Sequence, residues 1–289
     1  MSATEPVFEA ERPRLARLAY RMLGSLADAD DVLQEAYLRW TREERTSVAA
    51  PGPYLSSIVV RLCIDQRRLV EARKESYVGP WLPEPIVESD QPGPADRAET
   101  AETISLALLV VLESLSPVER AAFLLRRVFD YGYDEISSVL EKSQPNCRQL
   151  VHRAEQYIHQ RRPRFDAEPR QAEAITGAFL QACSTGDLDG LVRLLSDDVV
   201  VYSDGGGKVP AARAPVRGAD HVARFFLGVV KKAPADAEYR RVRVNGQPGV
   251  MTISAGAVVN VLTLDIVDGK VATCYAIRNP EKLARICLS

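Results

Sequence analysis

Residues 115–164 read LSPVERAAFLLRRVFDYGYDEISSVLEKSQPNCRQLVHRAEQYIHQRRPR. Ser116 is followed by Pro117 and, three residues on, by Glu119. This pattern is typical of a helix start, because the serine caps a free amide, the proline needs none, and the glutamate bonds back to the cap. We expect the helix to run to about Phe129, where Asp-Tyr-Gly interrupts it.

The second half of this stretch predicts two more helices close together. A short helix is expected over residues 133–140, a three-residue turn over 141–143, and a third helix from Gln144. Ser143 is a suitable N-cap, and Pro145 is tolerated in a first turn, whose amides have no intrahelical partner. Two helices joined by so short a turn are typical of a DNA-binding helix-turn-helix.

The third helix is predicted to have two unlike sides. Its apolar stripe consists of Cys147, Leu150, Val151, Ala154 and Ile158. Its other side carries Arg148, Gln149, His152, Arg153 and Gln156, and residues 144–164 hold five arginines against one acid. DNA binding is favoured by this distribution, but an ordinary amphipathic helical hairpin remains the alternative.

The composition limits the class of protein. The 289 residues have a net charge of −2 and 46% hydrophobic content, as in a globular chain long enough for two or three small domains. The five cysteines form no CxxC pair, so we expect no zinc site, no disulfide framework and no cofactor, and a cytoplasmic location. The acidic, polar start indicates no signal peptide, and the apolar run at 104–112 is too short to span a membrane.

Residues 6–73 are expected to be all helical, with an interruption at Gly24 and a loop at residues 49–53. Residues 25–40, SLADADDVLQEAYLRW, form an amphipathic pattern with an acidic first turn. Its apolar stripe is Ala29, Val32, Leu33, Ala36, Tyr37 and Trp40. From spacing alone, its polar side is simply a solvated helix face.

Residues 115–154 resemble the domain of extracytoplasmic-function (ECF) sigma factors that reads the −35 promoter element. Leu140, Ser143 and the run His152-Arg153-Ala154 match that family, whereas Glu141 and Lys142 stand where it has Gly and Ile. Gly is favoured where the backbone adopts a positive φ. The resemblance implies docking of this domain on the β flap of core RNA polymerase, and −35 contacts by Gln144, Asn146, Arg148, Gln149, His152 and Arg153.

Residues 28–40 are similar to the helix with which ECF sigma factors bind the clamp coiled coil of the polymerase β′ subunit. Asp31, Gln34 and Glu35 match the family position by position. The polymerase-binding residues implied are Asp31, Gln34, Glu35 and Arg39.

The next expected helix, residues 54–73, is cationic in its second half. In the resembling family this helix and the preceding loop capture the melted −10 strand, which implies roles for Arg61, Asp65, Arg67 and Arg68. A cationic helix gains affinity for a single strand by releasing counterions. Two alternatives remain: Asp65 is equally suited to a structural ion pair, and Arg67 and Arg68 to solubility.

Residues 76–101 are predicted to be an acidic linker, and no fixed structure is expected of it. Within it, Trp81-Leu82-Pro83-Glu84-Pro85 places a tryptophan in an extended stretch, where it needs a surface to dock on. The segment resembles a motif of the ECF subgroup that carries a fused SnoaL-like C-terminal domain. The alternative is an incidental loop tryptophan.

After residues 166–170 the pattern changes. Helices are expected at 171–184, 186–195 and 218–232, and strands at 198–203, 237–244, 249–254, 257–265 and 270–278. Asp268-Gly269 marks a hairpin turn. The pattern indicates an α+β domain that resembles the SnoaL-like cone, which can enclose a small-molecule ligand.

Relatives of this cone include cyclases and isomerases that use Asp or His. The candidates here are Asp198, Asp220, His221 and Asp265, but no spacing links them into an acid–base pair. Residues 204–208, DGGGK, do not form a P-loop. The resemblance instead implies a regulatory role for this loop and for residues 279–283. The implied regulatory residues are Trp81, Leu82, Pro83, Asp204, Gly205, Gly206, Gly207, Lys208, Asn279, Pro280 and Leu283.

The chain is thus identified as a multidomain ECF sigma factor that recruits core RNA polymerase to promoter DNA and is not itself an enzyme. Two all-α sigma domains, 1–75 and 102–166, flank the linker 76–101 and precede an α+β SnoaL-like domain at 167–289. We expect this last domain to regulate the sigma domains by holding the linker. The alternatives are a one-component DNA-binding regulator with a ligand-sensing domain and a SnoaL-like enzyme with a helical appendage.

Overall fold

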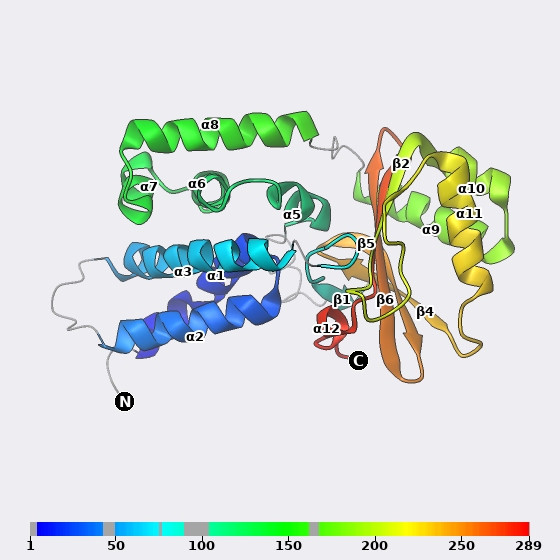
Figure 1. Cartoon of the computed structure of the whole chain (residues 1–289), viewed down its shortest axis with the longest axis horizontal. Helices are drawn as coiled ribbons and strands as arrows, with labels where there is room; N and C mark the ends of the chain where they lie inside the picture. The colour runs from blue at the N-terminus through cyan, green and yellow to red at the C-terminus, as the bar shows by residue number, and fades with distance from the viewer. Residues whose placement is uncertain (1–4, 43–49, 75–76, 90–103, 162–167, 289) are drawn as a thin grey trace. The chain divides into compact units, whose positions relative to one another are not determined.

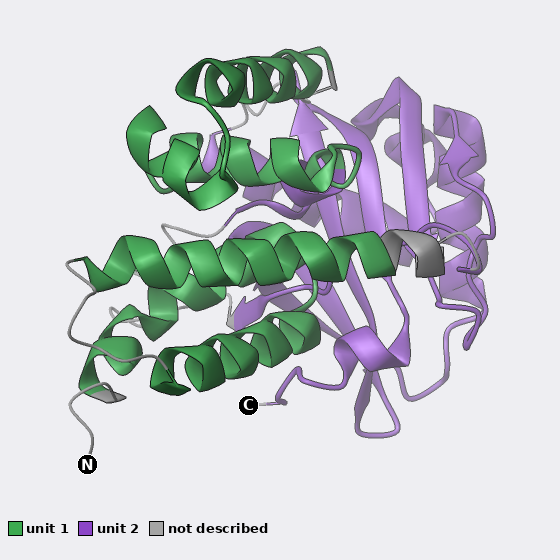
Figure 2. Ribbon diagram, turned by 60° about the vertical axis from the view of Figure 1, so that its left-hand side comes forward, with its two compact units in different colours: residues 1–76, 111–161 green, residues 77–110, 162–289 purple. Residues whose placement is uncertain are grey.

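The computed structural model describes residues 5–42, 50–74, 77–89, 104–161 and 168–288. The chain divides into two compact units (Figure 2). Residues 1–76 and 111–161 form the first unit, and residues 77–110 and 162–289 form the second. Residues 90–101 of the predicted linker lie outside the described residues.

The first unit begins with three long helices, α1 (Glu5–Leu23), α2 (Leu26–Arg42) and α3 (Pro51–Lys74). Gly24 has a φ of +69° and ends α1, as the sequence predicted. The buried residues of α2 are Ala29, Val32, Leu33, Ala36 and Trp40, which confirms most of the predicted stripe.

The predicted end of the loop at 49–53 is wrong, because α3 already starts at Pro51. Both Pro51 and Pro53 lie in its first turn, where a missing amide hydrogen costs nothing. Residues assigned to a loop from the sequence thus form the first turn of a helix.

The remaining helices are α5 (Leu106–Leu112), α6 (Pro117–Arg127), α7 (Tyr133–Leu140) and α8 (Gln144–Arg161). Ser116 and Glu119 form the predicted capping box of α6. Within the first unit, α6 packs against α1 and α3, and α7 packs against α3 (Figure 1). The two predicted sigma domains therefore contact each other inside this unit.

The second unit is built on a seven-stranded sheet in the order β1-β4-β5-β6-β7-β2-β3. Its strands are β1 (Val87–Ser89), β2 (Leu195–Asp204), β3 (Val216–Arg217), β4 (Glu238–Val244), β5 (Gln247–Ser254), β6 (Ala257–Val267) and β7 (Lys270–Ile277). Neighbouring strands are antiparallel except β2 and β7. Asp268 and Gly269 both have positive φ and form the predicted hairpin turn.

The two faces of this sheet have different covers. Leu262, Leu264 and Ile266 of β6 face α9 (Pro169–Thr185), α10 (Leu188–Leu194) and α11 (Ala219–Lys231), with Phe179 at the centre (Figure 1). Val261, which alternation places on the other face, packs with Leu82 and Leu106. The short helix α12 (Pro280–Leu283) adds Leu283 to this second core. One face is thus covered by helices and the other by the linker segment.

Residues 77–89 have a defined conformation, contrary to the expectation of an unstructured linker. β1 adds to the edge of the sheet beside β4. Just before it, Ile86 N donates to Asn245 Oδ1 at 3.1 Å and Asn245 N donates to Ile86 O at 2.8 Å. The linker composition is typical of disorder, but a sheet edge supplies the hydrogen bonds that the segment cannot make alone.

Candidate functional site

The helix-turn-helix of α7 and α8 has a small core of its own. Ala122 of α6 packs with Leu150 and Val151 of α8, and Tyr133 and Leu140 of α7 border them. This core orients α8 so that one side is exposed. The exposed residues include all six predicted for the −35 element, namely Gln144, Asn146, Arg148, Gln149, His152 and Arg153.

The turn between these helices is made by Glu141, whose φ of +53° lies in the left-handed region. The resembling family has Gly here, and Gly is favoured because it adopts this conformation without steric cost. The turn therefore has the geometry that favours Gly, although Glu141 adopts it with backbone strain. Glu141 also pairs with Arg61 of α3 at 3.0 Å.

Two arginines of α8 are held in place by neighbours. The Arg148 guanidinium lies 5.0 Å from the ring centroid of Tyr133, and its Nη2 donates to Gln144 Oε1 at 3.4 Å. Arg153 pairs with Glu119 at 3.3 Å. Cation–π stacking and exposed ion pairs are weak enough to exchange for contacts with phosphates or bases.

The predicted polymerase-binding residues share the exposed side of α2. Asp31 and Gln34 are exposed and Glu35 is half-buried. Glu35 accepts from Arg39 Nε at 2.8 Å. The buried stripe on the opposite side attaches the helix to α1 and α3 and leaves these polar groups accessible.

The predicted −10 residues of α3 separate into two groups. Arg61, Asp65 and Arg68 are exposed and follow a helical spacing, with Asp65 and Arg68 paired at 3.3 Å. Arg67, by contrast, has a side chain that is only 3% exposed. Its position gives it structural partners instead of an open surface.

Arg67 belongs to a buried cluster of charges. Its Nη1 lies 3.1 Å from Glu113 Oε1 and donates to Met22 O at 3.3 Å. Arg120, which is fully buried, pairs with the same carboxylate and donates from Nε to Arg21 O at 2.9 Å. Burial lowers the pKa of Arg120 to about 10, although Glu113 acts in the opposite direction. One carboxylate thus joins α3, α6 and the last turn of α1.

A second contact links the same elements. Arg14 of α1 donates to Ser56 Oγ of α3 and to Tyr131 Oη, each at 2.8 Å. Ser56 Oγ and Tyr131 Oη are themselves 2.8 Å apart. These bonds attach the segment between α6 and α7 to α1 and α3.

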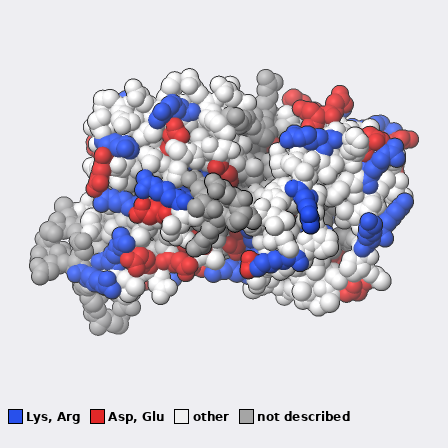
Figure 3. Space-filling model, viewed as in Figure 1, with Lys and Arg blue, Asp and Glu red and all other residues white. Residues whose placement is uncertain are grey.

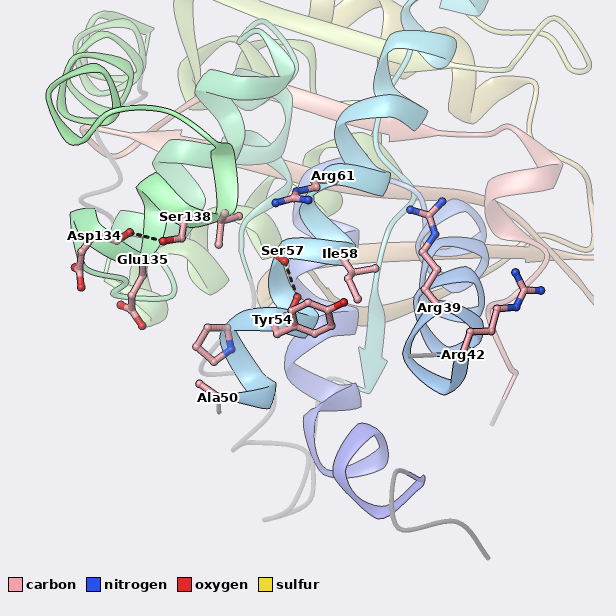
Figure 4. Close-up of a pocket in the computed structure, with 12 residues that line it drawn as sticks. Arg39, Arg42, Ala50, Tyr54, Ser57, Ile58, Arg61, Asp134, Glu135 and Ser138 are labelled. Carbon is pink, nitrogen blue, oxygen red and sulfur yellow. Dashed lines mark hydrogen bonds between the residues drawn. The ribbon is translucent and has the colours of Figure 1, made fainter. Parts of the chain in front are cut away.

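A hollow of about 950 Å³ lies between α2, α3 and α7 (Figure 4). Arg39 and Arg42 flank one side, Asp134 and Glu135 the other, and Arg61 stands above the centre. A predicted polymerase-binding arginine and a predicted −10 arginine thus line the same hollow. On the face of the protein shown in Figure 3, acidic and basic side chains are interspersed, in keeping with the net charge of −2.

The linker is held by Asp204, whose side chain is fully buried at the end of β2. Tyr77 Oη donates to Asp204 Oδ1 at 2.6 Å, and Leu82 N donates to Oδ2 at 2.9 Å. Lys282 Nζ donates to Oδ2 at 2.7 Å. Burial and the Asp204 carboxylate raise the pKa of the Tyr77 hydroxyl, so it remains a donor. Two linker residues and one residue of α12 therefore converge on one carboxylate.

Lys282 completes this attachment. Its Nζ also donates to Leu82 O and lies 4.1 Å from the ring centroid of Trp81. Leu82 is 1% exposed, and the next three residues of the WLPEP segment are buried. The predicted regulatory residues Trp81, Leu82 and Pro83 thus lie against the SnoaL-like part of the chain.

The glycine loop beside Asp204 allows close approach. A Cβ on Gly206 would lie 2.5 Å from Asn279 Nδ2, and one on Gly205 would lie 2.6 Å from Val209 O. Gly206 and Gly207 have φ values of +61° and +71°. Lys208 pairs with Glu281. The loop therefore needs its glycines, and it brings the 204–208 and 279–283 segments together.

Sequence reasoning missed three residues of this site. Tyr77 lies outside the WLPEP motif, Lys282 was not singled out within its motif, and Asn245, just after the strand predicted at 237–244, was not singled out either. Asn245 is buried, and its Nδ2 donates to Ile104 O at 3.2 Å. In the sequence, Asn245 and Lys282 look like ordinary turn and surface residues. Their role is recognised only from their contacts with the docked linker.

The four candidate catalytic residues are not brought together. Asp220 and His221 are exposed on α11, where Asp220 pairs with Arg224 at 2.8 Å, and Asp198 is exposed on β2. Asp265 is buried, but by strand alternation it lies on the linker-covered face instead of the helix-covered one. These four side chains therefore do not form one site.

Three segments of the chain match known families. Residues 7–72 match sigma-70 region 2, residues 105–158 match sigma-70 region 4, and residues 177–280 match the SnoaL-like domain. The chain is 37% identical to the ECF RNA polymerase sigma factor SigJ of Mycobacterium tuberculosis, over 95% of this chain and 91% of the relative. This chain belongs to the ECF sigma factor family.

Two further comparisons agree with this membership. The sigma factor is 33% identical to the probable ECF RNA polymerase sigma factor SigI of Mycobacterium tuberculosis, over 98% of this chain and 97% of the relative. The crystal structure of SigJ from Mycobacterium tuberculosis superposes with a TM-score of 0.77 at 34% identity, covering 96% of this chain and 98% of that one. The predicted fold class is thereby confirmed as two helical sigma regions followed by a SnoaL-like domain.

In this sigma factor, α1 to α3 correspond to region 2 and α6 to α8 to region 4. Among the described residues, no helix is long and apolar enough to cross a membrane. The same residues contain no group of three or more His, Cys, Asp or Glu side chains placed to hold a metal ion.

Proposed function

We propose that this sigma factor directs core RNA polymerase to promoters through three exposed helix faces. The exposed side of α2, with Asp31, Gln34 and Glu35, is the docking face for the β′ clamp coiled coil. Region 4 docks on the β flap, and α8 enters the major groove of the −35 element. The work is promoter recruitment in the cytoplasm and needs no catalytic step or cofactor.

The observation that carries the −35 assignment is the exposure of one continuous side of α8 from Gln144 to Arg153. In a helix-turn-helix, the first residues of the second helix reach base edges. Arg148 is well placed for this, because its present partners are an aromatic ring and a neutral amide. A bidentate contact from arginine to guanine is worth about 1–3 kcal/mol of discrimination.

For the −10 element we propose Arg61, Asp65 and Arg68, which share an exposed face of α3. Arg67 joins them only when region 4 separates from region 2, because its side chain is covered by Glu113 in this arrangement. A −10 contact by Arg67 therefore requires the Glu113 cluster to open.

We propose that the SnoaL-like domain regulates the sigma regions through the attachment at Asp204. The linker joins region 2 to region 4, so a domain that holds its residues 77–89 limits how the two regions move. A buried carboxylate that accepts from Tyr77, Leu82 and Lys282 is suited to this task, since loss of any one donor weakens the others. A small-molecule ligand of this domain would act on the same attachment.

The direct experiment is run-off transcription with purified core polymerase and a set of genomic promoter fragments. Full-length protein should give promoter-specific transcripts, and Asp31→Lys with Glu35→Lys should abolish core binding while the circular-dichroism spectrum stays helical. Unchanged co-purification of that variant with core polymerase would contradict the docking role of α2.

The −35 role is tested on a cognate promoter. Arg148→Ala should lower affinity for the specific duplex by about 5- to 150-fold, which corresponds to roughly 1–3 kcal/mol. Arg153→Ala, which removes a charge paired with Glu119, should weaken specific and random duplexes alike. Equal losses on both duplexes for Arg148→Ala would exclude base reading by that residue.

The regulatory role is tested with four proteins in the same transcription assay. These are the full chain, a truncation after Asp166, a shorter truncation before Asn279, and Trp81→Ala. Both truncations and Trp81→Ala should change promoter-specific activity and increase protease cleavage near residue 81. Identical activity and cleavage in all four would mean that the SnoaL-like domain plays no part in regulation.

A further inference from the structure

Asp265 is a buried acid without an evident partner. Its residue is 5% exposed on β6, and its Oδ2 atom accepts no hydrogen bond from any described residue. Burial raises the pKa of this carboxyl to about 6. A buried carboxylate is costly unless a cation or a hydrogen-bond donor compensates it. Asp204, another deeply buried acid of this unit, accepts from four donors: Tyr77 Oη, Leu82 N, Gly206 N and Lys282 Nζ.

Asp265 lines a cavity of about 120 Å³. The floor consists of Thr263, Asp265 and Tyr275 on the linker-covered face of the sheet. The roof is the start of α5, where Leu106 and Ala107 line the cavity. The space is slightly smaller than an engineered cavity of about 150 Å³ that admits benzene. It is therefore large enough for a small organic molecule.

The lining limits the chemistry of an occupant. Asp265 supplies the negative charge, and the buried side chains of Ile266 and Leu106 supply apolar surface. Tyr275 adds an aromatic ring, which stacks at 6.0 Å on Tyr202 and is 5% exposed. A metal ion would find too few ligands, because the described residues contain no group of three His, Cys, Asp or Glu side chains. A cation with a short alkyl part would complement the carboxylate, the apolar surface and the aromatic ring.

We propose that this cavity is a binding site for a small primary ammonium compound. Its N–H groups donate to Asp265 Oδ2, and its alkyl part lies against Leu106 and Ile266. The site lies where the two cores of this unit meet: Leu106, Ala107 and Tyr275 belong to the linker-covered core, and Ala172, Leu264 and Ile266 to the helix-covered core.

A molecule bound in the cavity would affect the linker attachment through the residues at the start of α5. Residues 105–107 begin α5, and Ile104 just before them accepts from Asn245, which also holds Ile86 of the linker. Binding should therefore tighten the docking of residues 77–89. This consequence rests on the regulation proposed above, whereas the binding site itself does not.

The test uses the full-length protein and ethylammonium chloride as the probe, at a pH well above the pKa of Asp265. Carboxyl carbon NMR of Asp265 should show a saturable shift, and the thermal midpoint should rise. Sodium chloride at equal ionic strength and tetraethylammonium, which is bulky and has no N–H group, should do neither.

Three variants distinguish the site from a general effect of amines. Asp265→Asn should weaken binding at least about tenfold, as expected for loss of a charge-assisted hydrogen bond. Ala107→Val narrows the cavity from the roof and keeps the carboxylate, and it should also weaken binding. Asp198→Asn, the same change at an exposed acid of this unit, should leave binding intact.

The absence of a saturable shift, or an equal response to tetraethylammonium, would overturn the proposal. An equal thermal response in Asp265→Asn and the full-length protein would do the same. These measurements need no polymerase. Binding without any change in transcription would keep the site and would contradict only the proposed regulation.

Discussion

Each unit of this sigma factor contains a buried charge cluster, and the two clusters are balanced differently. In the first unit, Glu113 is shared by Arg67 and Arg120, so two cations face one anion. In the second unit, Asp204 meets one cation, Lys282, and three uncharged donors, Tyr77 Oη, Leu82 N and Gly206 N. Nη2 of Arg120 has no hydrogen-bond partner among the described residues. The first cluster therefore leaves a buried guanidinium nitrogen unsatisfied, whereas no side-chain atom of Asp204 or Lys282 is unsatisfied among the described residues.

This difference indicates which contact is built to separate. An unsatisfied buried guanidinium nitrogen costs free energy, so we expect the contact between regions 2 and 4 to be the weaker of the two. It is also the contact that covers Arg67 of α3. The attachment of the linker at Asp204 is satisfied and should persist while the sigma regions open.

The largest effect is expected from Glu113→Gln. It leaves Arg67 and Arg120 buried without their anion, which should lower the free energy of unfolding by about 3–5 kcal/mol. Urea denaturation followed by circular dichroism measures this. Asp65→Asn, at an exposed ion pair, is the matched control and should change stability by less than about 0.5 kcal/mol. Equal effects of the two substitutions would mean that the cluster is not a desolvated one.

Asp204→Asn should come next, with a loss of about 2–4 kcal/mol, because it removes the anion beside the buried Lys282 amine. The change should also release residues 77–89, which hydrogen exchange at Leu82 N and protease cleavage near Trp81 would report. Asp198→Asn provides the exposed comparison. If Asp204→Asn kept its stability and residues 77–89 stayed protected, Asp204 would not be the group that holds the linker.

Asp265 pairs with no cation of the described residues, and its effect on stability should depend on pH. Its folded pKa of about 6 lies above its ordinary value, so the unfolded chain releases this proton first as pH rises. Stability from this group is therefore present below about pH 4 and is lost as pH rises through about 6, a change of about 3 kcal/mol. Asp265→Asn should remove the dependence, so the difference in unfolding free energy between the two proteins should grow over this range. A flat difference would mean that the carboxyl is compensated.

The smallest effect is expected at the exposed pair of Glu141 and Arg61. Glu141→Gly removes left-handed strain and should stabilise the protein by up to about 1 kcal/mol, even though the exposed ion pair is lost. Glu141→Ala loses the pair and keeps the strain, so it should not stabilise. If both variants behaved alike in thermal unfolding, the ion pair and not the turn geometry would control this position.

Local features were predictable because they depend on residues that are close in sequence. The capping box at Ser116, the stripe on α2, the three-residue turn and the hairpin at Asp268 each follow from periodicity, capping or turn chemistry. The bounds of α3 were not predictable to the residue, because proline both breaks helices and starts them. The same local features carried the resemblance to the ECF family.

Tertiary structure decided the partners of the charged residues. The sequence by itself determined the order of the helices and strands, the family, and the segments that bear on function. It did not determine that Arg67 is buried beside Glu113, that Asp265 lies on the linker-covered face, or that Tyr77 and Lys282 meet at Asp204. These contacts join residues far apart along the chain, so they depend on packing geometry that no local pattern records.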